Sequence, residues 1–223
     1  MGLFDVFKKK TGPESDKGPY RNPALNKIYN LLFCDNIHLY QFDNAAAVYP
    51  WNILLSQQPD ITSLKAITKD RALETRARII AHKTLRSLGV PAEEKELLAV
   101  IIEVGLEKGL DTLAAYRDGT ARLLHHSESV LVWDTQTPLS TQLIDQLFIP
   151  SMNVITEIGP STQPRKPRPD FSMVRLTFIA SDGVYVGEGS FNKLEKDNKL
   201  GSVIYSATRL MSFLIQQKGT PGR

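Results

Sequence analysis

The apolar and polar positions between residues 96 and 134 form four apolar runs separated by three short turns, the pattern of a β-meander. The first run, 97–102, is unbroken, and this predicts a central strand that is covered on both faces. Asp118-Gly119 predicts a two-residue type I′ turn, which requires positive φ at both positions. The expected strands are 97–104, 110–117, 121–126 and 130–133.

Further along the chain, the same alternation predicts a hairpin with strands 173–179 and 184–191 around a turn at 181–183. Helical periodicity and capping residues predict the helices. They are a helix opened by Pro23 after Asn22, helices 61–67, 70–88 and 139–157, and a last helix capped by Asp197 or Asn198 and ended by Gly219. Residues 35–60 are expected to be irregular, with one helical turn near 52–57 and Trp51 packed on the core.

These elements predict an α+β fold, an antiparallel sheet of about six strands with helices packed on it. We expect a flexible tip and linker over 1–22, a single domain over 23–219 and a tail over 220–223. Within the domain, the helical part is 23–89 and the sheet-containing part is 90–219. The alternative is two subdomains that divide at about Gly89.

Two of the predicted helices carry features beyond periodicity. In 70–88 the face opposite the apolar stripe is rich in arginine, and we interpret it as solvated, with Glu74 and Arg78 paired at i,i+4 spacing. In 139–157, with Ser140 as the expected cap, Pro150 predicts a kink or a break near Phe148.

Composition narrows the class of protein. The chain has 223 residues, of which 42% are apolar, and one cysteine, Cys34, so it can form no internal disulfide and no cysteine-based metal cluster. A reducing compartment fits this, and no apolar run reaches the roughly 20 residues that a membrane-spanning helix needs. We therefore expect a cytoplasmic protein.

Charge gives little information about partners. The formal net charge is +3, and the basic footprint formed by Arg165, Lys166, Arg168 and the basic helix face has no interleaved aromatic residues for base stacking. We expect no nucleic-acid binding. Residues 1–10, MGLFDVFKKK, form a short amphipathic basic segment, from which we expect at most weak membrane-surface contact.

Three stretches are similar to a family of bacterial proteins of unknown function: AAYRDGTARLL at 114–124 followed by VLVW at 130–133, SDGVYVGEG at 181–189, and ETRAR at 74–78. The resemblance covers much of the chain from about residue 50 onward. It implies a bacterial source and a shared fold, and it brings no activity, cofactor or catalytic residue.

The pair His125-His126 is the first candidate for chemistry, because imidazole titrates near neutral pH and ligates metals. On a strand, however, adjacent residues point to opposite faces, so we predict no metal site and no cofactor. Gly187 and Gly189 lack the residues of a phosphate-binding loop and are interpreted as packing or bulge positions. A possible interaction surface combines Arg165, Lys166 and Arg168 with Gly187 and Gly189.

Two hypotheses for function remain. The first is a non-enzymatic binding or protein-interaction module of the bacterial cytosol, whose partner is another protein or a small molecule. The alternative is an enzyme with scattered catalytic residues near the meander edge, for which the candidates are His125, His126, Tyr116 and Asp118. A pocket of several hundred Å³ with convergent polar groups and a buried titratable residue would favour the enzyme.

The state of association depends on how the sheet edges are covered. We expect residues 35–60, which contain Ile37, Leu39, Tyr40 and Phe42, to cover an edge and leave a monomer. If this stretch packs on helices instead, an isologous homodimer through an exposed edge or helix face is expected.

Overall fold

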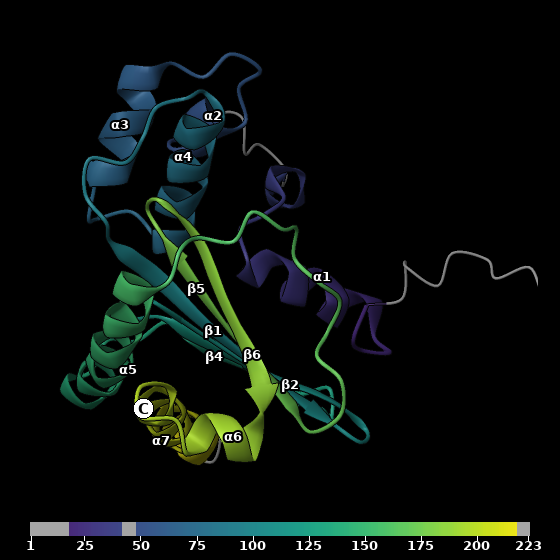
Figure 1. Cartoon of the computed structure of the whole chain (residues 1–223). Helices are drawn as coiled ribbons and strands as arrows, with labels where there is room; N and C mark the ends of the chain where they lie inside the picture. Colours follow the sequence, from purple (N-terminus) through teal and green to yellow (C-terminus); the bar gives the residue numbers. More distant parts are fainter. Residues whose placement is uncertain (1–17, 42–47, 218–223) are drawn as a thin grey trace, which may run out of the picture.

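The computed structural model describes residues 18–41 and 48–217, and the predictions made for the amphipathic segment 1–10, for Phe42 and for the tail lie outside these residues. An antiparallel six-stranded sheet with the order β4-β3-β2-β1-β5-β6 lies between two layers of helices (Figure 1). The predicted α+β fold is confirmed. The strands are β1 (Leu97–Leu106), β2 (Gly109–Tyr116), β3 (Ala121–Leu124), β4 (Val130–Trp133), β5 (Met173–Ala180) and β6 (Gly183–Ser190).

Strand β1 is the centre of the sheet, as its unbroken apolar run predicts. It pairs with β2 through Ala99 to Leu106 and with β5 through Leu97 to Val104, and its first seven residues are buried. Its alternate side chains enter two separate hydrophobic cores, one on each face. The sheet therefore holds both helical layers through one strand.

The first core contains the helices that precede the sheet in the chain. They are α1 (Pro23–Leu32), the 3-10 helix η2 (Ile37–Tyr40), α2 (Trp51–Leu54), α3 (Ile61–Lys69) and α4 (Thr75–Ser87). As predicted, the side chain of Asn22 caps α1 by accepting the N–H of Ala24, and that of Asp60 caps α3 by accepting the N–H of Ser63.

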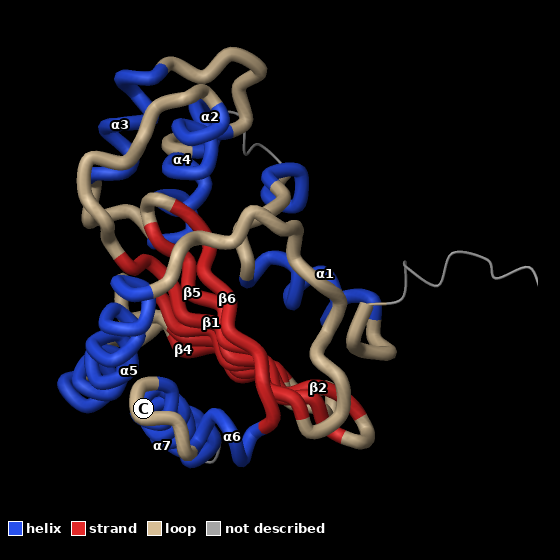
Figure 2. The backbone as a smooth tube through the Cα atoms, in the orientation of Figure 1, coloured by secondary structure: helices blue, strands red, loops and turns tan. Residues whose placement is uncertain are grey.

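The second core contains α5 (Pro138–Glu157), α6 (Phe191–Glu195) and α7 (Leu200–Gln217). Figure 2 shows α5 and α7 on the side of the sheet opposite α1. Asp197 supplies the expected cap of α7 by accepting the N–H of Leu200, whereas the short α6 was not predicted. Among the described residues, no helix is both long and apolar enough to cross a membrane.

Helix α5 is continuous through Pro150, so the alternative of two pieces is wrong. The expected cap at Ser140 is also shifted: Thr137 is the N-cap, and Ser140 is its partner in a capping box. Pro138 occupies the first turn, where its missing N–H costs nothing.

The described residues of the stretch 35–60 do not cover a sheet edge. Among its described residues, η2 packs with α1 and α2 packs with α3 and α4, and no strand is added to the sheet. Tyr40 stacks on the buried Trp51 at 5.1 Å between ring centroids, so the expected packing of Trp51 is confirmed. Because the described residues of this stretch pack on helices and leave the sheet edges uncovered, we predict an isologous dimer.

The hairpin between β2 and β3 differs from the predicted type I′ turn. Only Gly119 has positive φ there, at 83°, and the N–H of Gly119 donates to the carbonyl oxygen of Tyr116. The connection is therefore a longer loop with a single left-handed position, which glycine fills without strain.

Helix α4 starts at Thr75, five residues later than predicted. Asp70 instead ends α3, and its carboxylate accepts the N–H of Ala72, so the intervening residues form a turn. The missing cap comes from the β2–β3 loop: the carboxylate of Asp118 accepts the N–H of Thr75 at 2.7 Å. In return, the N–H of Asp118 donates to the hydroxyl of Thr75 at 3.0 Å.

The basic face of α4 is not the solvated face that its sequence indicates. The side chain of Arg78 is only 3% exposed, and it donates to Glu96 at 2.7 Å and to the carbonyl oxygen of Thr68 at 3.0 Å. Glu74 pairs with Arg76 instead of Arg78. Leu88, the last residue of the predicted helix 70–88, lies after α4 and is 48% exposed.

The cap of α4 by Asp118 yields a test of this packing. We expect Asp118→Ala to lower the free energy of unfolding by about 2 kcal/mol, because the carboxylate that accepts the N–H groups of Thr75 and Thr120 is lost and the N–H of Thr75 is left without its cap. Asp118→Asn retains an acceptor and should lose less. Urea denaturation measures both.

The control is Asp145→Ala, since the ion pair of Asp145 with Arg117 spans 3.4 Å between groups that are 53% and 43% exposed. This variant should stay within about 0.5 kcal/mol of the wild type. An equal loss in Asp118→Ala and Asp145→Ala would contradict the capping role.

Candidate functional site

A groove lies at the end of the sheet where β1 begins. Its volume is about 630 Å³, within the range of small-molecule sites. We call it the α3–α5 groove, because its walls come from α3 and α4, from residues 91–97 and from the middle of α5. A smaller cavity of about 280 Å³ shares Arg71 and Arg117 with it.

One wall of the α3–α5 groove is apolar. Phe148, Ile149 and Met152 on consecutive turns of α5 line it, with Leu85 of α4 contributing from the other side. Ile149 is 65% exposed, unlike the neighbouring Phe148, which is 3% exposed. The groove therefore offers an apolar surface that no described residue covers.

The other wall is charged. Lys65 and Lys69 both pair with Glu93, at 3.9 and 3.0 Å, and Arg71 pairs with Glu96 at 2.5 Å. The side chains of Lys69 and Arg71 are each 66% exposed, so solvent and ligands reach their charged ends. These exposed pairs contribute little to stability and exchange partners readily.

His82 is the histidine that lines the groove. Its pKa is lowered to about 4, chiefly by burial, with the neighbouring Arg78 and Arg86 adding to the shift and Glu96 opposing it. Its ring forms no hydrogen bond with any described residue. His82 is therefore neutral at physiological pH. It was not singled out in the sequence, where its burial was not visible.

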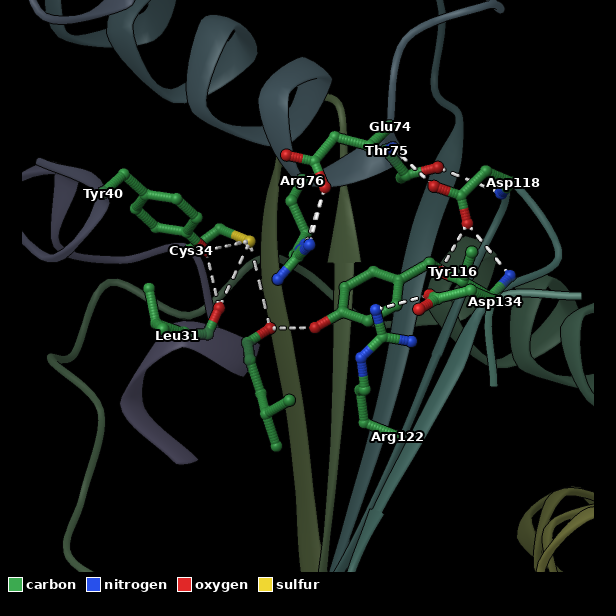
Figure 3. Close-up of polar contacts among 12 residues, drawn as sticks. Leu31, Cys34, Tyr40, Glu74, Thr75, Arg76, Tyr116, Asp118, Arg122 and Asp134 are labelled. Carbon is green, nitrogen blue, oxygen red and sulfur yellow. Dashed lines mark hydrogen bonds and ion pairs between the residues drawn. The ribbon is translucent and has the colours of Figure 1, made fainter. Parts of the chain in front are cut away.

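Of the residues considered for catalysis, Tyr116 and Asp118 are structural. Figure 3 shows Tyr116 pointing away from Asp118 and toward α1, where its hydroxyl donates to the carbonyl oxygen of Leu32 at 2.8 Å. Tyr116 is 1% exposed, and burial raises its pKa far above the usual range. The carboxylate of Asp118 accepts hydrogen bonds from the backbone N–H groups of Thr75 and Thr120.

Cys34 belongs to the same buried network. Its thiol is 1% exposed and accepts a hydrogen bond from the hydroxyl of Tyr40 at 3.2 Å (Figure 3). Burial raises the pKa of the thiol to about 12, so the reactive thiolate is not formed at neutral pH. Its role is packing.

His125 and His126 are not on a strand. Strand β3 ends at Leu124, and the chain turns at His125, where the N–H of Glu128 donates to its carbonyl oxygen at 2.8 Å. The argument that adjacent side chains point to opposite faces therefore does not apply. The two imidazole rings lie 3.8 Å apart between centroids, beside Asp111 of β2.

The residues of the possible interaction surface lie along the connector 159–171 and on β6. Arg165 is tied to the first helical layer: it pairs with Asp35 at 2.7 Å and lies over the ring of Phe33 at 4.2 Å. Gly189 packs against Leu194, whereas a side chain at Gly187 would meet open space. Lys166 and Arg168 are exposed.

A buried ionic cluster joins this connector to the sheet, and sequence reasoning missed it. Arg175 of β5 donates to Glu188 at 2.8 Å and to the carbonyl oxygens of Lys166 and Pro167. It also lies 3.7 Å from Glu103 on β1, which is fully buried. The available signal was a glutamate within the apolar run of a central strand.

Comparisons of the chain with protein-family models, with curated proteins and with solved structures find no match. The similarity to a family of bacterial proteins of unknown function stays a prediction.

The lowered pKa of His82 gives a prediction for pH dependence. The folded-state pKa of about 4 lies below the ordinary value of 6.5, so between these values the unfolded chain binds more protons. The stability that the neutral His82 contributes is therefore present above pH 6.5 and is lost as the pH falls toward 4. We expect His82→Gln to flatten the loss of stability over this window, measured by urea denaturation.

The control for this experiment is His38→Gln, because His38 lies exposed on η2. This variant should lose stability with falling pH at the same rate as the wild type. Equal slopes for the wild type and His82→Gln would contradict a buried neutral imidazole in the groove.

Proposed function

We propose that the protein is a non-enzymatic binding module, and that its ligand is a small molecule with an apolar body and an anionic group. The observation that carries this proposal is the α3–α5 groove, in which the exposed Ile149 faces solvent on one wall and the exposed Lys69 and Arg71 stand on the other. An apolar lining with a few charged groups is typical of ligand sites.

The sign of the ligand charge follows from the lining residues. Five cationic side chains line the groove against three carboxylates, and two of the carboxylates already pair with lysine or arginine within it. An anionic ligand group can replace Glu93 at Lys69, because Glu93 keeps Lys65 as a partner. It can likewise replace Glu96 at Arg71, because Glu96 keeps Arg78. The cations are Lys65, Lys69, Arg71, Lys95 and Arg117, and the carboxylates are Glu93, Glu94 and Glu96.

The enzyme is the alternative, and the groove has the volume and the half-buried histidine that would favour it. Two features favour binding instead. A base with a pKa of about 4 abstracts protons poorly at neutral pH. The hydroxyl in the lining, that of Thr68, donates to the carbonyl oxygen of Lys65, so it is not paired with His82 as a nucleophile.

A bacterial, cytoplasmic setting is part of the proposal. The cytoplasmic part is supported by the buried free thiol of Cys34, which needs no oxidising compartment. The bacterial part is supported by the resemblance of residues 114–124, 130–133 and 181–189 to a bacterial family.

Anilinonaphthalenesulfonate and N-phenylnaphthylamine test the proposal, because they share an aromatic body and differ by one sulfonate. We expect the sulfonated probe to bind the folded protein with a saturable rise in fluorescence, and more tightly than the uncharged one. Lys69→Glu should weaken binding of the sulfonated probe about tenfold and leave the uncharged probe unchanged. Ile149→Ser should weaken both probes.

The matched controls are Lys193→Glu on α6 and Ile215→Ser on α7, which change an exposed lysine and a half-exposed isoleucine away from the groove. They should leave both affinities unchanged. Equal binding of the two probes, or equal losses in groove and control variants, would overturn the proposed site.

A further inference from the structure

The tip of the meander opposite the α3–α5 groove brings together two imidazoles and a carboxylate. Register places Thr112 of β2 opposite Leu124, the last residue of β3. Asp111, one residue before Thr112, therefore lies level with the start of the β3–β4 turn, where His125 and His126 follow. Three residues from two segments thus meet at one point, although Asp111 precedes the two histidines by 14 and 15 residues in the sequence.

The distances suit a metal ion. One ligand atom from each of the three residues lies within 4.8 Å of those of the other two. Bonds of about 2.0–2.2 Å to a tetrahedral ion hold ligand atoms about 3.3 Å apart, so side-chain rotation alone closes the gap. All three residues are half-buried, which gives an ion access from solvent while limiting the competing water.

Existing hydrogen bonds orient the ligand atoms. Asp111 Oδ1 accepts the backbone N–H of His126 at 2.6 Å and lies 2.9 Å from its ring Nδ1. His125 Nδ1 accepts the N–H of Ser127 at 3.2 Å. Both Nδ1 atoms are thus engaged, whereas neither Nε2 has a hydrogen bond with a described residue. A partner on one ring nitrogen orients metal-binding histidines in proteins, as the N–H of Ser127 does for His125. At His126, Nδ1 and Asp111 Oδ1 already converge on one point.

The turn itself is held rigid. Glu128 has positive φ, 66°, and its carboxylate accepts the backbone N–H of Arg21 at 2.7 Å. The N–H of His125 donates to the carbonyl oxygen of Ser129 at 2.9 Å, which closes the turn. Because the backbone is fixed, little order remains to be gained when an ion binds.

We propose that His125, His126 and Asp111 form a binding site for one divalent transition-metal ion, of which Zn²⁺ is the first candidate. Two imidazoles and one carboxylate favour Zn²⁺ and its neighbours in the first row over Mg²⁺ and Ca²⁺, which prefer oxygen ligands. Three protein ligands leave a position open for water or a further ligand. The bound ion joins β2 to the β3–β4 turn.

Calorimetric titration of the full chain, freed of any affinity tag and stripped of metal with a chelator, tests the site. We expect one Zn²⁺ per chain, undiminished by a large excess of Mg²⁺. Zn²⁺ should also raise the melting temperature of the wild type, because it binds the folded state. His125→Ala and His126→Ala should each weaken binding at least about tenfold, and Asp111→Asn should weaken it too.

His38→Ala is the matched control, since it removes an exposed histidine on η2. It should bind Zn²⁺ as the wild type does. Thermal melting in the presence of chelator tests whether each variant is folded. If His126→Ala is unfolded, the more exposed His125→Ala and nitrogen NMR of the two imidazole rings test the site instead. Coordination should shift the metal-bound nitrogen of each ring.

Four results would overturn the proposal: a dissociation constant weaker than about 0.1 mM for the wild type, one ion shared by two chains, displacement by Mg²⁺, or an unchanged affinity in the histidine variants. The probe experiments on the α3–α5 groove are independent of this outcome, because none of the three ligands lines that groove.

Discussion

The burial of β1 on both faces is the constraint on which the rest of the structure depends, because this strand carries a carboxylate into the interior. Glu103 accepts a hydrogen bond from Tyr29 of α1 at 2.6 Å, and its second oxygen lies 3.7 Å from Arg175 without a hydrogen bond. Desolvation raises the pKa of this carboxyl group. A group that is costly to bury requires its partners to be in place, and these partners come from α1 and β5.

The arrangement of the connector follows from the same cluster. Arg175 holds the backbone of the connector 159–171 through two carbonyl oxygens, and the close approach of Asp170 to Gly105 leaves no room for a side chain on β1 there. Arg165 then extends the contact to Asp35 and to the ring of Phe33. One buried carboxylate thereby joins the first helical layer, the central strands and the connector.

The two candidate sites lie at opposite ends of this rigid sheet. The α3–α5 groove lies where β1 begins, and its charged wall rests on the buried Arg78, which links α3 and α4 to Glu96. The turn that carries His125 and His126 lies beyond the far end of β3, where the backbone N–H of Arg21, before α1, donates to Glu128. Each site is built by side chains on fixed elements, which keeps ligand-binding groups in position without a ligand.

The sequence alone determined the α+β fold, the six strands, and the starts of α1 and α3, because alternation, helical period and caps such as Asn22 and Asp60 act between near neighbours. Tertiary structure decided what depends on distant partners. The start of α4 is set by Asp118, 43 residues away, and Arg78 is buried because Glu96 accompanies it. His125 and His126 face one point because β3 ends at Leu124, before both of them, and hydrophobic alternation does not encode this boundary.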